Sequence, residues 1–496
     1  MEAVLKALKE NPYLKLIADN FKDYPQEIYL VGGYLRDLFL NTPASNTQAS
    51  RRIDFDFAVS CEAIKISRQI ARKLKSGFVV LDKVHGSSRI VHIKNGFSSN
   101  FDFTDFRGST ALTTGGQDIF ADLGHRDFTI NSLAVNLRAI KNARTIDTIL
   151  LDPYSGRADI KARLIRVTSQ FSLQEDPLRI LRAFSLSAIL NLRIEAKTKI
   201  AIKKYKKKIT SSAFERISEE LFKILNSGNG FKAFKAMDEY RILDELMPEI
   251  KVMRRVRQGP YHHLDVFGHA FEALRQIELL FSELRRNRNV QGYLNKVISG
   301  THTKRALLKL AAFLHDIGKP AAKERIKGKT CFHGHERIGR NIARDIGERL
   351  RLSNDEKNAL DKMIFWHLRP GYIADIENLS QRAIYRFFRD AQDEAVSILL
   401  LSIADQRSTR GPLTRGANRK HHEDVCLGLA REFFRKAKQI KRLPLVNGYD
   451  IMRHLKLLPG PLIGKILEEI NEAQAAGEIE TKPQALELAR RFLKTG

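Results

Sequence analysis

The N-terminal part of the chain contains an acidic pair whose spacing suits metal-dependent chemistry on phosphates. Asp54 and Asp56 lie in Ile53-Asp-Phe-Asp-Phe-Ala-Val59, where acidic and apolar residues alternate. Such alternation is typical of a β-strand and places both carboxylates on one face. Two carboxylates this close repel each other unless a cation lies between them. The pattern therefore fits a metal site, and it fits equally well a solvated strand face whose other side is buried.

A pair of glycines precedes these acids. The apolar run 28–31 predicts a strand that ends at Gly32-Gly33, and residues 34–40 predict a helix. Backbone without a Cβ can approach a ligand closely, and the first N–H groups of the helix, together with Arg36, could face anionic oxygens. Because a glycine pair between a strand and a helix is more often only a turn, this motif carries weight only together with others.

Two further segments complete the pattern. Asn100-Phe-Asp-Phe-Thr-Asp-Phe-Arg107 repeats the alternation and could bring Asp102 from a neighbouring strand. Three carboxylates would form an oxygen-rich site suited to Mg²⁺. The segment Gly124-His-Arg-Asp-Phe-Thr-Ile-Asn131 is the third stretch of the set.

Four ordered motifs resemble the class II nucleotidyltransferase family, which contains tRNA CCA-adding, CC-adding and A-adding enzymes and bacterial poly(A) polymerases. They are Leu30-Val-Gly-Gly-Tyr-Leu-Arg-Asp37 with Asp54-Phe-Asp56, His125-Arg-Asp-Phe-Thr-Ile-Asn131, Glu175-Asp-Pro-Leu-Arg-Ile-Leu-Arg-Ala183 and Phe214-Glu-Arg-Ile-Ser-Glu-Glu-Leu221. The resemblance implies that an RNA 3′-hydroxyl attacks the α-phosphate of a nucleoside triphosphate and expels pyrophosphate. It also implies that Asp54 and Asp56 hold the catalytic metals, with Asp102 as the third acidic residue.

The resemblance also implies a set of nucleotide-binding residues. They are Gly32, Gly33, Arg36, Arg126, Asp127, Asn131, Asp176, Arg179 and Arg182. Asp176 and Arg179 match the family's base-reading element, where Asp accepts from an exocyclic amine and Arg donates, which favours cytosine or adenine. Asp176-Pro177 is also an ordinary helix start, with Asp as N-cap. Two departures from the family pattern are His125 and Ser185, at positions where relatives often carry Arg.

A second constellation lies in the middle of the chain and resembles a metal-binding HD domain. Its members are His269, His315-Asp316, His335, His367 and Asp405. Imidazole and carboxylate ligands suit a divalent transition metal. The resemblance implies phosphohydrolase or phosphodiesterase activity on cyclic phosphates or RNA ends, although members of such families can keep the fold and lose the chemistry.

The composition agrees with an RNA partner. Lys and Arg number 85 against 57 acidic residues, a net charge of +28, which attracts polyanions but also fits a membrane surface or simple solubility. The run Lys203-Lys204-Tyr205-Lys206-Lys207-Lys208 is either a solvated helix face or a contact with an RNA backbone. No apolar stretch reaches transmembrane length, and three scattered cysteines form no disulfide framework. We therefore expect no membrane partner and a cytoplasmic location, and the sequence leaves the oligomeric state open.

The expected fold class is α+β: a nucleotidyltransferase head with a small mixed β-sheet and helices, followed by an all-helical neck, an HD-type body and a helical tail. The expected domains are an N-terminal helix at 1–22, the catalytic head at 23–165, a neck that binds the base and RNA at 166–230, the HD domain at 231–425 and the tail at 426–496. The short Gly/Thr-rich segment 108–117 slightly favours an enzyme of partial CCA addition.

These observations predict a tRNA 3′-terminal nucleotidyltransferase that uses CTP and ATP with Mg²⁺. CCA addition is the first interpretation, and CC-only or A-only addition follows closely. The alternatives are a poly(A) polymerase, an HD metal phosphohydrolase whose N-terminal part is an RNA-binding module, and a basic RNA-binding scaffold without catalysis.

Overall fold

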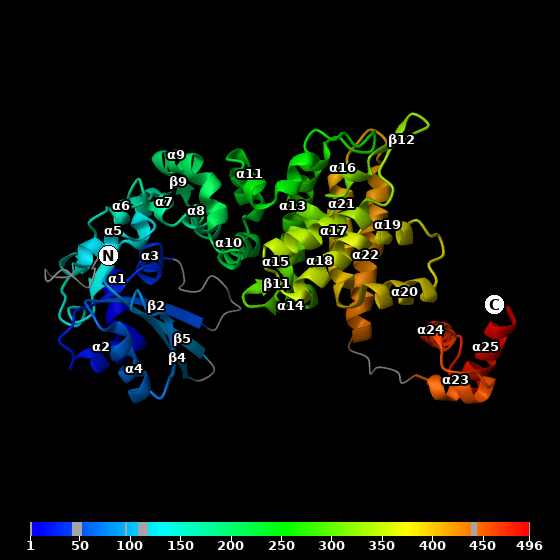
Figure 1. Ribbon diagram of the computed structural model, residues 1–496, viewed down its shortest axis with the longest axis horizontal. Helices are drawn as coiled ribbons and strands as arrows, with labels where there is room; N and C mark the ends of the chain where they lie inside the picture. Colours follow the sequence, from blue (N-terminus) through cyan, green and yellow to red (C-terminus); the bar gives the residue numbers. More distant parts are fainter. Residues whose placement is uncertain (1, 42–51, 95–96, 108–117, 438–443, 496) are drawn as a thin grey trace. The chain divides into compact units, whose positions relative to one another are not determined.

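The protein divides into two compact units, Met1–Leu246 and Met247–Gly496. The structure is a computed structural model, and it describes residues 2–41, 52–94, 97–107, 118–437 and 444–495 (Figure 1). The segment 108–117, on which the expectation of partial CCA addition depended, lies outside the described residues. The α+β class is confirmed, with a mixed sheet in the first unit and helical structure in most of the second.

The first unit begins with a head built on one mixed sheet. Its elements are α1 (Glu2–Glu10), α2 (Pro12–Phe21), β1 (Ile28–Val31), α3 (Gly33–Phe39), β2 (Arg52–Val59), α4 (Ala63–Lys73), β3 (Gly77–Asp82), β4 (Ser87–Lys94), β5 (Phe97–Asp105), α5 (Ile119–Gly124), β6 (Ala134–Asn136), β7 (Leu150–Leu151) and α6 (Gly156–Ala162). Among the described residues the strand order is β3-β4-β5-β2-β1-β6-β7. β2 and β5 run parallel, side by side in Figure 1, and the other neighbours pair antiparallel.

The alternation in β2 and β5 explains how this sheet is anchored. Phe55, Phe57, Phe101 and Phe103 are buried on one face, and ring centroids of neighbouring pairs lie 5.1 to 5.6 Å apart. Because side chains alternate along a strand, the acidic residues between them project from the opposite face. The packed phenylalanines therefore fix the orientation of the acidic face.

The single leading helix expected at residues 1–22 is instead two helices. α1 ends at Glu10, and Asn11 caps α2 by accepting from the backbone N–H groups of Tyr13 and Leu14. Pro12 occupies the first turn of α2, where its missing N–H costs nothing but where it cannot continue the preceding helix.

The rest of the first unit is nearly all helical, as expected from residue 166. Its elements are β8 (Leu164–Ile165), α7 (Ser172–Glu175), α8 (Arg179–Leu190), β9 (Arg193–Ile194), α9 (Ala196–Tyr205), α10 (Phe214–Asn226), α11 (Gly230–Glu239) and α12 (Ile242–Leu246). The last two helices belong to this unit, so its limit falls after residue 246 and not after residue 230.

The second unit consists of a helical body and a small tail. The body elements are α13 (Val266–Glu283), α14 (Arg288–Leu294), β10 (Val297–Ser299), β11 (His302–Thr303), α15 (Lys304–Leu314), α16 (Lys319–Ala322), β12 (Glu324–Ile326), β13 (Lys329–Cys331), α17 (His335–Arg349), α18 (Asn354–Trp366), α19 (Arg369–Ala374), α20 (Gln381–Ala391), α21 (Ala395–Ser408) and α22 (Gly416–Ala437). The expected boundary after residue 425 falls inside α22.

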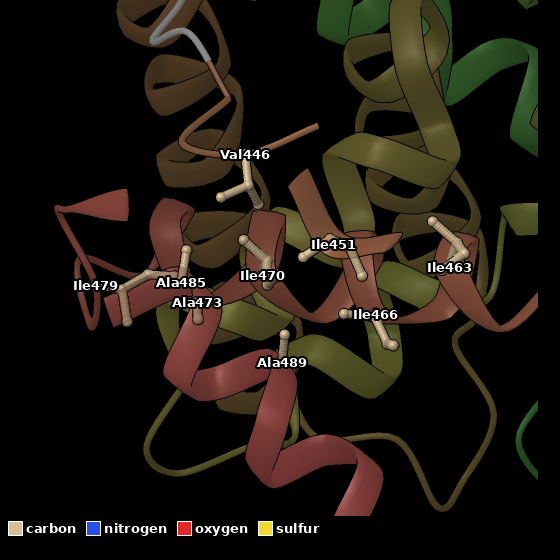
Figure 2. Packing of buried hydrophobic residues seen from close by; sticks show 9 residues of the cluster. All are labelled: Val446, Ile451, Ile463, Ile466, Ile470, Ala473, Ile479, Ala485 and Ala489. Carbon is tan, nitrogen blue, oxygen red and sulfur yellow. The ribbon is translucent and has the colours of Figure 1, made fainter. Parts of the chain in front are cut away.

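The tail has its own apolar core. Its helices are α23 (Gly448–Leu455), α24 (Pro461–Ala475) and α25 (Lys482–Thr495). Figure 2 shows that isoleucines such as Ile451, Ile466 and Ile470 meet small residues such as Ala485 and Ala489 between these helices. Of the helices in the described ranges, none has the length and apolar character to cross a membrane.

Candidate active site and metal centre

The acidic pair lies at the centre of the head sheet. Val31 at the end of β1 is the cross-strand neighbour of Asp56 on β2. A Cβ on Gly32 would lie 2.7 Å from Asp56 Oδ2, and Gly32 has φ +78°. Only glycine accepts this combination of close approach and left-handed φ. Gly32 therefore lets the chain turn against the carboxylate of Asp56.

Two of the three acidic side chains, Asp54 and Asp102, have defined partners. Asn100 Nδ2 donates to Asp54 Oδ1 over 2.6 Å, and Arg89 forms a bidentate ion pair with Asp102, with both distances 2.7 Å. Burial, together with the charges of Asp102 and Asp54, raises the pKa of Asp56, although the nearby Arg126 opposes the shift. A cation beside Asp56 would relieve this repulsion.

Asp102 lies on β5, which pairs with β2 and places Asp102 opposite Asp56. Among the described residues, however, the oxygens of Asp54, Asp56 and Asp102 do not converge within 4.8 Å of one another. Arg89 holds both oxygens of Asp102. The role of Asp102 as a third metal ligand therefore stays a prediction.

A cavity of about 280 Å³ adjoins Asp56 and gathers all nine predicted nucleotide-binding residues. The predicted residues in its wall are Gly32, Gly33, Arg36, Asp56, Arg126, Asp127, Asn131, Asp176, Arg179 and Arg182, and Arg107 and Arg216 join them. Arginines dominate this wall. Such a surface suits the phosphates of a nucleoside triphosphate.

A chain of hydrogen bonds fixes this wall. Arg36 Nη1 donates to Asn131 Oδ1 over 2.8 Å, and Asn131 Nδ2 donates to Asp127 Oδ1 over 3.0 Å. Asp127 Oδ2 lies 3.0 Å from Arg182 Nη2. Burial raises the pKa of Asp127, but the charge of Arg182 and the hydrogen bond from Asn131 outweigh it and hold that pKa below its usual value. Asp127 is thus a charged anchor that connects motifs far apart in the sequence.

The predicted base-reading residues lie in the same wall, with different roles for their side chains. Asp176 accepts from the N–H of Leu178 and from Arg216 Nη2, each over 3.2 Å, and α8 begins only at Arg179. Arg179 donates to the carbonyl of His125 and to Ser172 Oγ, each over 2.6 Å. Both terminal nitrogens of the Arg179 guanidinium are therefore engaged within the protein. Of the two predicted base-reading side chains, Asp176 is the more available for contact with a base.

The two departures from the family pattern have different surroundings. The side chain of His125 is exposed, and its carbonyl receives Arg179. Ser185 is buried and donates to Glu220 Oε2 over 2.5 Å. Ser185 therefore joins α8 to α10, while His125 contributes mainly through its backbone.

The second unit brings the predicted HD residues together. His269 Nε2 lies 2.9 Å from Asp405 Oδ1 and 3.5 Å from Asp316 Oδ2. His315 Nε2 lies 3.3 Å from the same oxygen of Asp316 and 3.7 Å from Asp405 Oδ1. Tetrahedral ligands about 2.1 Å from a cation lie roughly 3.4 Å from one another. The spacing of His269, His315 and Asp316 therefore fits a metal ion, and Asp405 Oδ1 lies beside both imidazoles.

A second set of donors uses the other oxygen of Asp316. Asp316 Oδ1 lies 3.3 Å from His335 Nε2 and 3.9 Å from His367 Nε2, and the two imidazole nitrogens are 3.4 Å apart. Asp316 thus connects two sets of ligand atoms, one through each oxygen. The sequence analysis predicted that His335 and His367 belong to the metal site, but it did not predict that they form a second donor set with Asp316.

The tautomers of these histidines also suit metal binding. Nδ1 of His315, His335 and His367 lies within 2.9 Å of a backbone carbonyl three residues earlier. A ring that donates from Nδ1 presents the lone pair of Nε2, as metal-bound histidines commonly do. The buried Nε2 of His315 makes no hydrogen bond to any residue that the structure describes. Burial lowers the pKa of His367 to about 3, so this ring is neutral.

Several residues at both sites were missed by sequence reasoning. They are Arg89, Asn100, Asp122, Arg216, Gln258 and Lys319. Asp122 accepts from Arg126, four residues later, a spacing that a helix prediction could have detected. Arg89 and Asn100 depend on strand register, which the sequence does not reveal.

The tight approach at Gly32 gives a testable expectation. We expect Gly32→Ala to lower nucleotide incorporation about 100-fold, because a displacement of about 1 Å at a reacting group can have that effect. The strained backbone should also lower the free energy of unfolding by about 1 to 3 kcal/mol. Incorporation assays and denaturant unfolding would measure both effects.

Gly228→Ala is the matched control for this substitution. A Cβ there would meet no heavy atom within 4 Å among the described residues, and Gly228 does not have a positive φ. Equal losses in both variants would contradict the assigned role of Gly32.

Comparison with known proteins identifies four successive family models along the chain. They are the poly(A) polymerase head domain at residues 28–166, the probable RNA- and SrmB-binding site of polymerase A at 191–253, the HD domain at 266–410 and tRNA nucleotidyltransferase domain 2 at 436–489. Their order reproduces the expected order of head, neck, body and tail.

Curated relatives extend this likeness. An A-adding tRNA nucleotidyltransferase of Deinococcus radiodurans is 29% identical over 75% of this chain and 79% of its own length. A CC-adding tRNA nucleotidyltransferase of Thermus thermophilus is 26% identical over 93% of this chain and 92% of its own.

Solved structures share the fold. A CCA-adding enzyme in complex with ATP has a TM-score of 0.64, with 20% identity over 99% of this chain and 98% of that chain. A Thermotoga maritima CCA-adding enzyme complexed with tRNA has a TM-score of 0.61 with the same identity and coverage. The chain therefore contains a poly(A) polymerase head domain, an HD domain and a tRNA nucleotidyltransferase domain in succession, and it is similar along most of its length to tRNA nucleotidyltransferases.

Proposed function

We propose that the protein is a tRNA 3′-terminal nucleotidyltransferase that transfers CMP, AMP or both from CTP and ATP. The observation that best supports this proposal is the arginine-rich cavity beside the partly buried carboxylate of Asp56. The 3′-oxygen of the RNA forms a bond to the α-phosphorus, the bond from that phosphorus to the bridging oxygen breaks, pyrophosphate leaves and the hydroxyl proton is released.

The residues of the head divide this work. Asp54 and Asp56 would hold Mg²⁺, which supplies charge stabilisation for the attacking and leaving oxygens when bound. Arg36, Arg126 and Arg182 face the cavity and would bind the triphosphate. Asp176 would accept a hydrogen bond from the exocyclic amino group that cytosine and adenine both carry. Uracil lacks this group, so the protein itself would select the base and no nucleic-acid template would be needed.

Incorporation of single labelled nucleotides onto tRNA transcripts tests this function. Transcripts would end at the discriminator base, at C and at CC, with an unrelated RNA as control. Because the CC-adding relative aligns along nearly the whole chain and the A-adding relative along three quarters of it, we expect partial or full CCA addition confined to tRNA. Long A tails on any RNA would indicate a poly(A) polymerase, and no incorporation would reject the proposal.

The base-reading role of Asp176 predicts a change of specificity. Asp176→Asn keeps an acceptor for the N–H of Leu178 but adds a donor that uracil can use. We expect the ratio of kcat/KM for CTP over UTP to fall at least tenfold, about 1.4 kcal/mol. Glu239→Gln, an exposed change on α11 outside this cavity, is the control. An unchanged ratio in Asp176→Asn would remove Asp176 from base selection.

We propose a second activity, phosphate ester hydrolysis, in the HD body. The observation that favours it is the pair of donor sets that share Asp316. His269, His315, Asp316 and Asp405 would hold one divalent transition metal, and His335, His367 and Asp316 would hold another. When bound, these metals would supply an activated water, whose oxygen would bond to phosphorus while the ester oxygen leaves with a proton. Hydrolysis of glycerol 2-phosphate, measured as released phosphate, tests this activity.

We expect the protein to act in the cytoplasm.

A further inference from the structure

We infer that Arg89 is a positioning residue for the proposed nucleotidyl transfer. It holds Asp102 in the free protein and exchanges that carboxylate for a backbone phosphate near the RNA 3′ end. RNA binding thereby frees Asp102 to face the catalytic metal. The role of Arg89 rests on the proposed function of the head, because it concerns the same site.

Arg89 lies in one row with two of the acidic residues. Its strand β4 is adjacent to β5, and β5 is adjacent to β2 (Figure 1). Arg89 is the cross-strand neighbour of Asp102, and Asp102 is the cross-strand neighbour of Asp56. Nε and Nη2 of Arg89 donate to the two oxygens of Asp102, each over 2.7 Å. The guanidinium therefore competes directly with any cation for Asp102.

The nucleotide cavity and Arg89 lie on opposite sides of Asp56. In the sheet, β1 borders β2 on one side, and β5 followed by β4 lies on the other. The cavity includes Gly32, Gly33 and Arg36, which follow β1, and none of the described residues of β3, β4 or β5. In phosphoryl transfer the attacking and leaving oxygens lie roughly in line with the phosphorus. With the triphosphate in the cavity, the RNA 3′-hydroxyl therefore approaches from the side of Arg89.

The sheet face that carries Arg89 is accessible. Ser88, the preceding residue, projects from the opposite face, where its hydroxyl lies 2.7 Å from that of Ser67 on α4. α4 thus covers the face of β4 that does not carry Arg89. The side chain of Arg89 is 30% exposed, and its cross-strand neighbour Val79 on the edge strand β3 is 51% exposed. This face therefore offers an RNA strand access to the guanidinium.

A guanidinium suits the exchange because its planar fork binds a carboxylate and a phosphate in the same bidentate way. An RNA phosphate can therefore replace Asp102 without leaving the charge of Arg89 unpaired. Asp102 is then free to complete the acidic site with Asp54 and Asp56. RNA binding and completion of the metal site are thereby coupled, and such a coupling acts in both directions.

A double-mutant cycle tests this exchange with four proteins: the wild type, Arg89→Gln, Asp102→Asn and the double variant. Fluorescence anisotropy measures binding of a labelled tRNA transcript that ends at C, in the presence of EDTA. Asp102→Asn should tighten RNA binding at least about fivefold, because Arg89 becomes available to the phosphate. In the Arg89→Gln background the same change should alter the Kd less than about twofold. A general effect of charge would instead tighten binding in both backgrounds.

Mn²⁺ binding to the free proteins, followed by electron paramagnetic resonance, provides the second readout. Arg89→Gln should tighten Mn²⁺ binding to the head at least about fivefold, because no guanidinium competes for Asp102. In the Asp102→Asn background the same change should alter the affinity less than about twofold. Metal ions bound in the second unit contribute equally to all four proteins.

Two controls make the result specific. Arg72→Gln removes an exposed arginine of α4, which covers the opposite face, and should leave both affinities unchanged. A transcript without the single-stranded 3′ end should bind to Asp102→Asn and to the wild type equally, because it brings no phosphate to Arg89. Unfolding temperatures establish that all four proteins of the cycle are folded.

Additive effects in the cycle, unchanged affinities in the single variants, or equal tightening with the transcript that lacks the 3′ end would each overturn the inference. Incorporation of labelled CMP by the wild type separates this failure from failure of the proposed function. If CMP is incorporated but the cycle shows no coupling, only the role of Arg89 is rejected. Absence of incorporation rejects the proposed function itself.

Discussion

Asp56→Asn is expected to reduce incorporation of CMP and AMP into tRNA by roughly 10³-fold or more. A bound metal contributes several kcal/mol of transition-state stabilisation, and each 1.36 kcal/mol is about tenfold in rate. Asparagine keeps the shape of the side chain but removes the charge that would hold the cation. Single-turnover incorporation with saturating CTP or ATP measures the effect on the chemical step.

This loss should not result from unfolding. Asp56 carries a raised pKa because burial and the charges of Asp102 and Asp54 disfavour its ionised form. Replacing it with a neutral side chain removes that repulsion, so the unfolding temperature should stay the same or rise. Asp82→Asn, on exposed β3 of the same sheet, controls for loss of an acidic residue and should retain activity. More than a tenth of normal activity in Asp56→Asn would contradict the assignment.

The acidic face of the head sheet was predictable because it depends on a local rule. Side chains alternate along a strand, so the buried phenylalanines of β2 and β5 dictate where Asp54, Asp56 and Asp102 project. The break between α1 and α2 also has a local cause, the cap at Asn11 and the proline at position 12. The expectation of a single helix overlooked this signal. Local chemistry was therefore sufficient wherever neighbours in sequence decide the structure.

The partners of these acids could not be predicted in the same way. Arg89 meets Asp102 only because β4 and β5 pair in one register, and a shift of one residue would turn Arg89 to the other face. The requirement for glycine at position 32 likewise depends on Asp56, which is 24 positions away in the chain. These contacts depend on tertiary packing.

The HD residues show the same division. Their residue types indicated metal binding, and the structure adds which oxygen of Asp316 faces which histidines. Histidines 335 and 367 come from α17 and from the end of α18, and only the packing of these two helices brings their rings within 3.4 Å. The His and Asp residue types therefore indicated a metal site, and the fold is needed to show that the donors form two sets.

Asp316→Asn is expected to abolish hydrolysis of glycerol 2-phosphate, by roughly 10³-fold or more, while incorporation of nucleotides into tRNA is unchanged. Both donor sets share this carboxylate, and an amide cannot supply a charged oxygen to each of two cations. Elemental analysis of the purified proteins should find up to two divalent metal ions in the wild type and none in the variant. His335→Gln, which alters only the second set, should retain one ion.

The unchanged head activity is the internal control for folding of the Asp316→Asn chain. The variant leaves the buried Lys319 without its ion-pair partner, so some loss of stability in the second unit is expected. Chelation of the wild-type protein avoids this complication: it should remove hydrolysis, and addition of a divalent transition metal should restore it. Full hydrolysis in Asp316→Asn, or equal metal content in Asp316→Asn and His335→Gln, would show that the two donor sets do not share a bridging carboxylate.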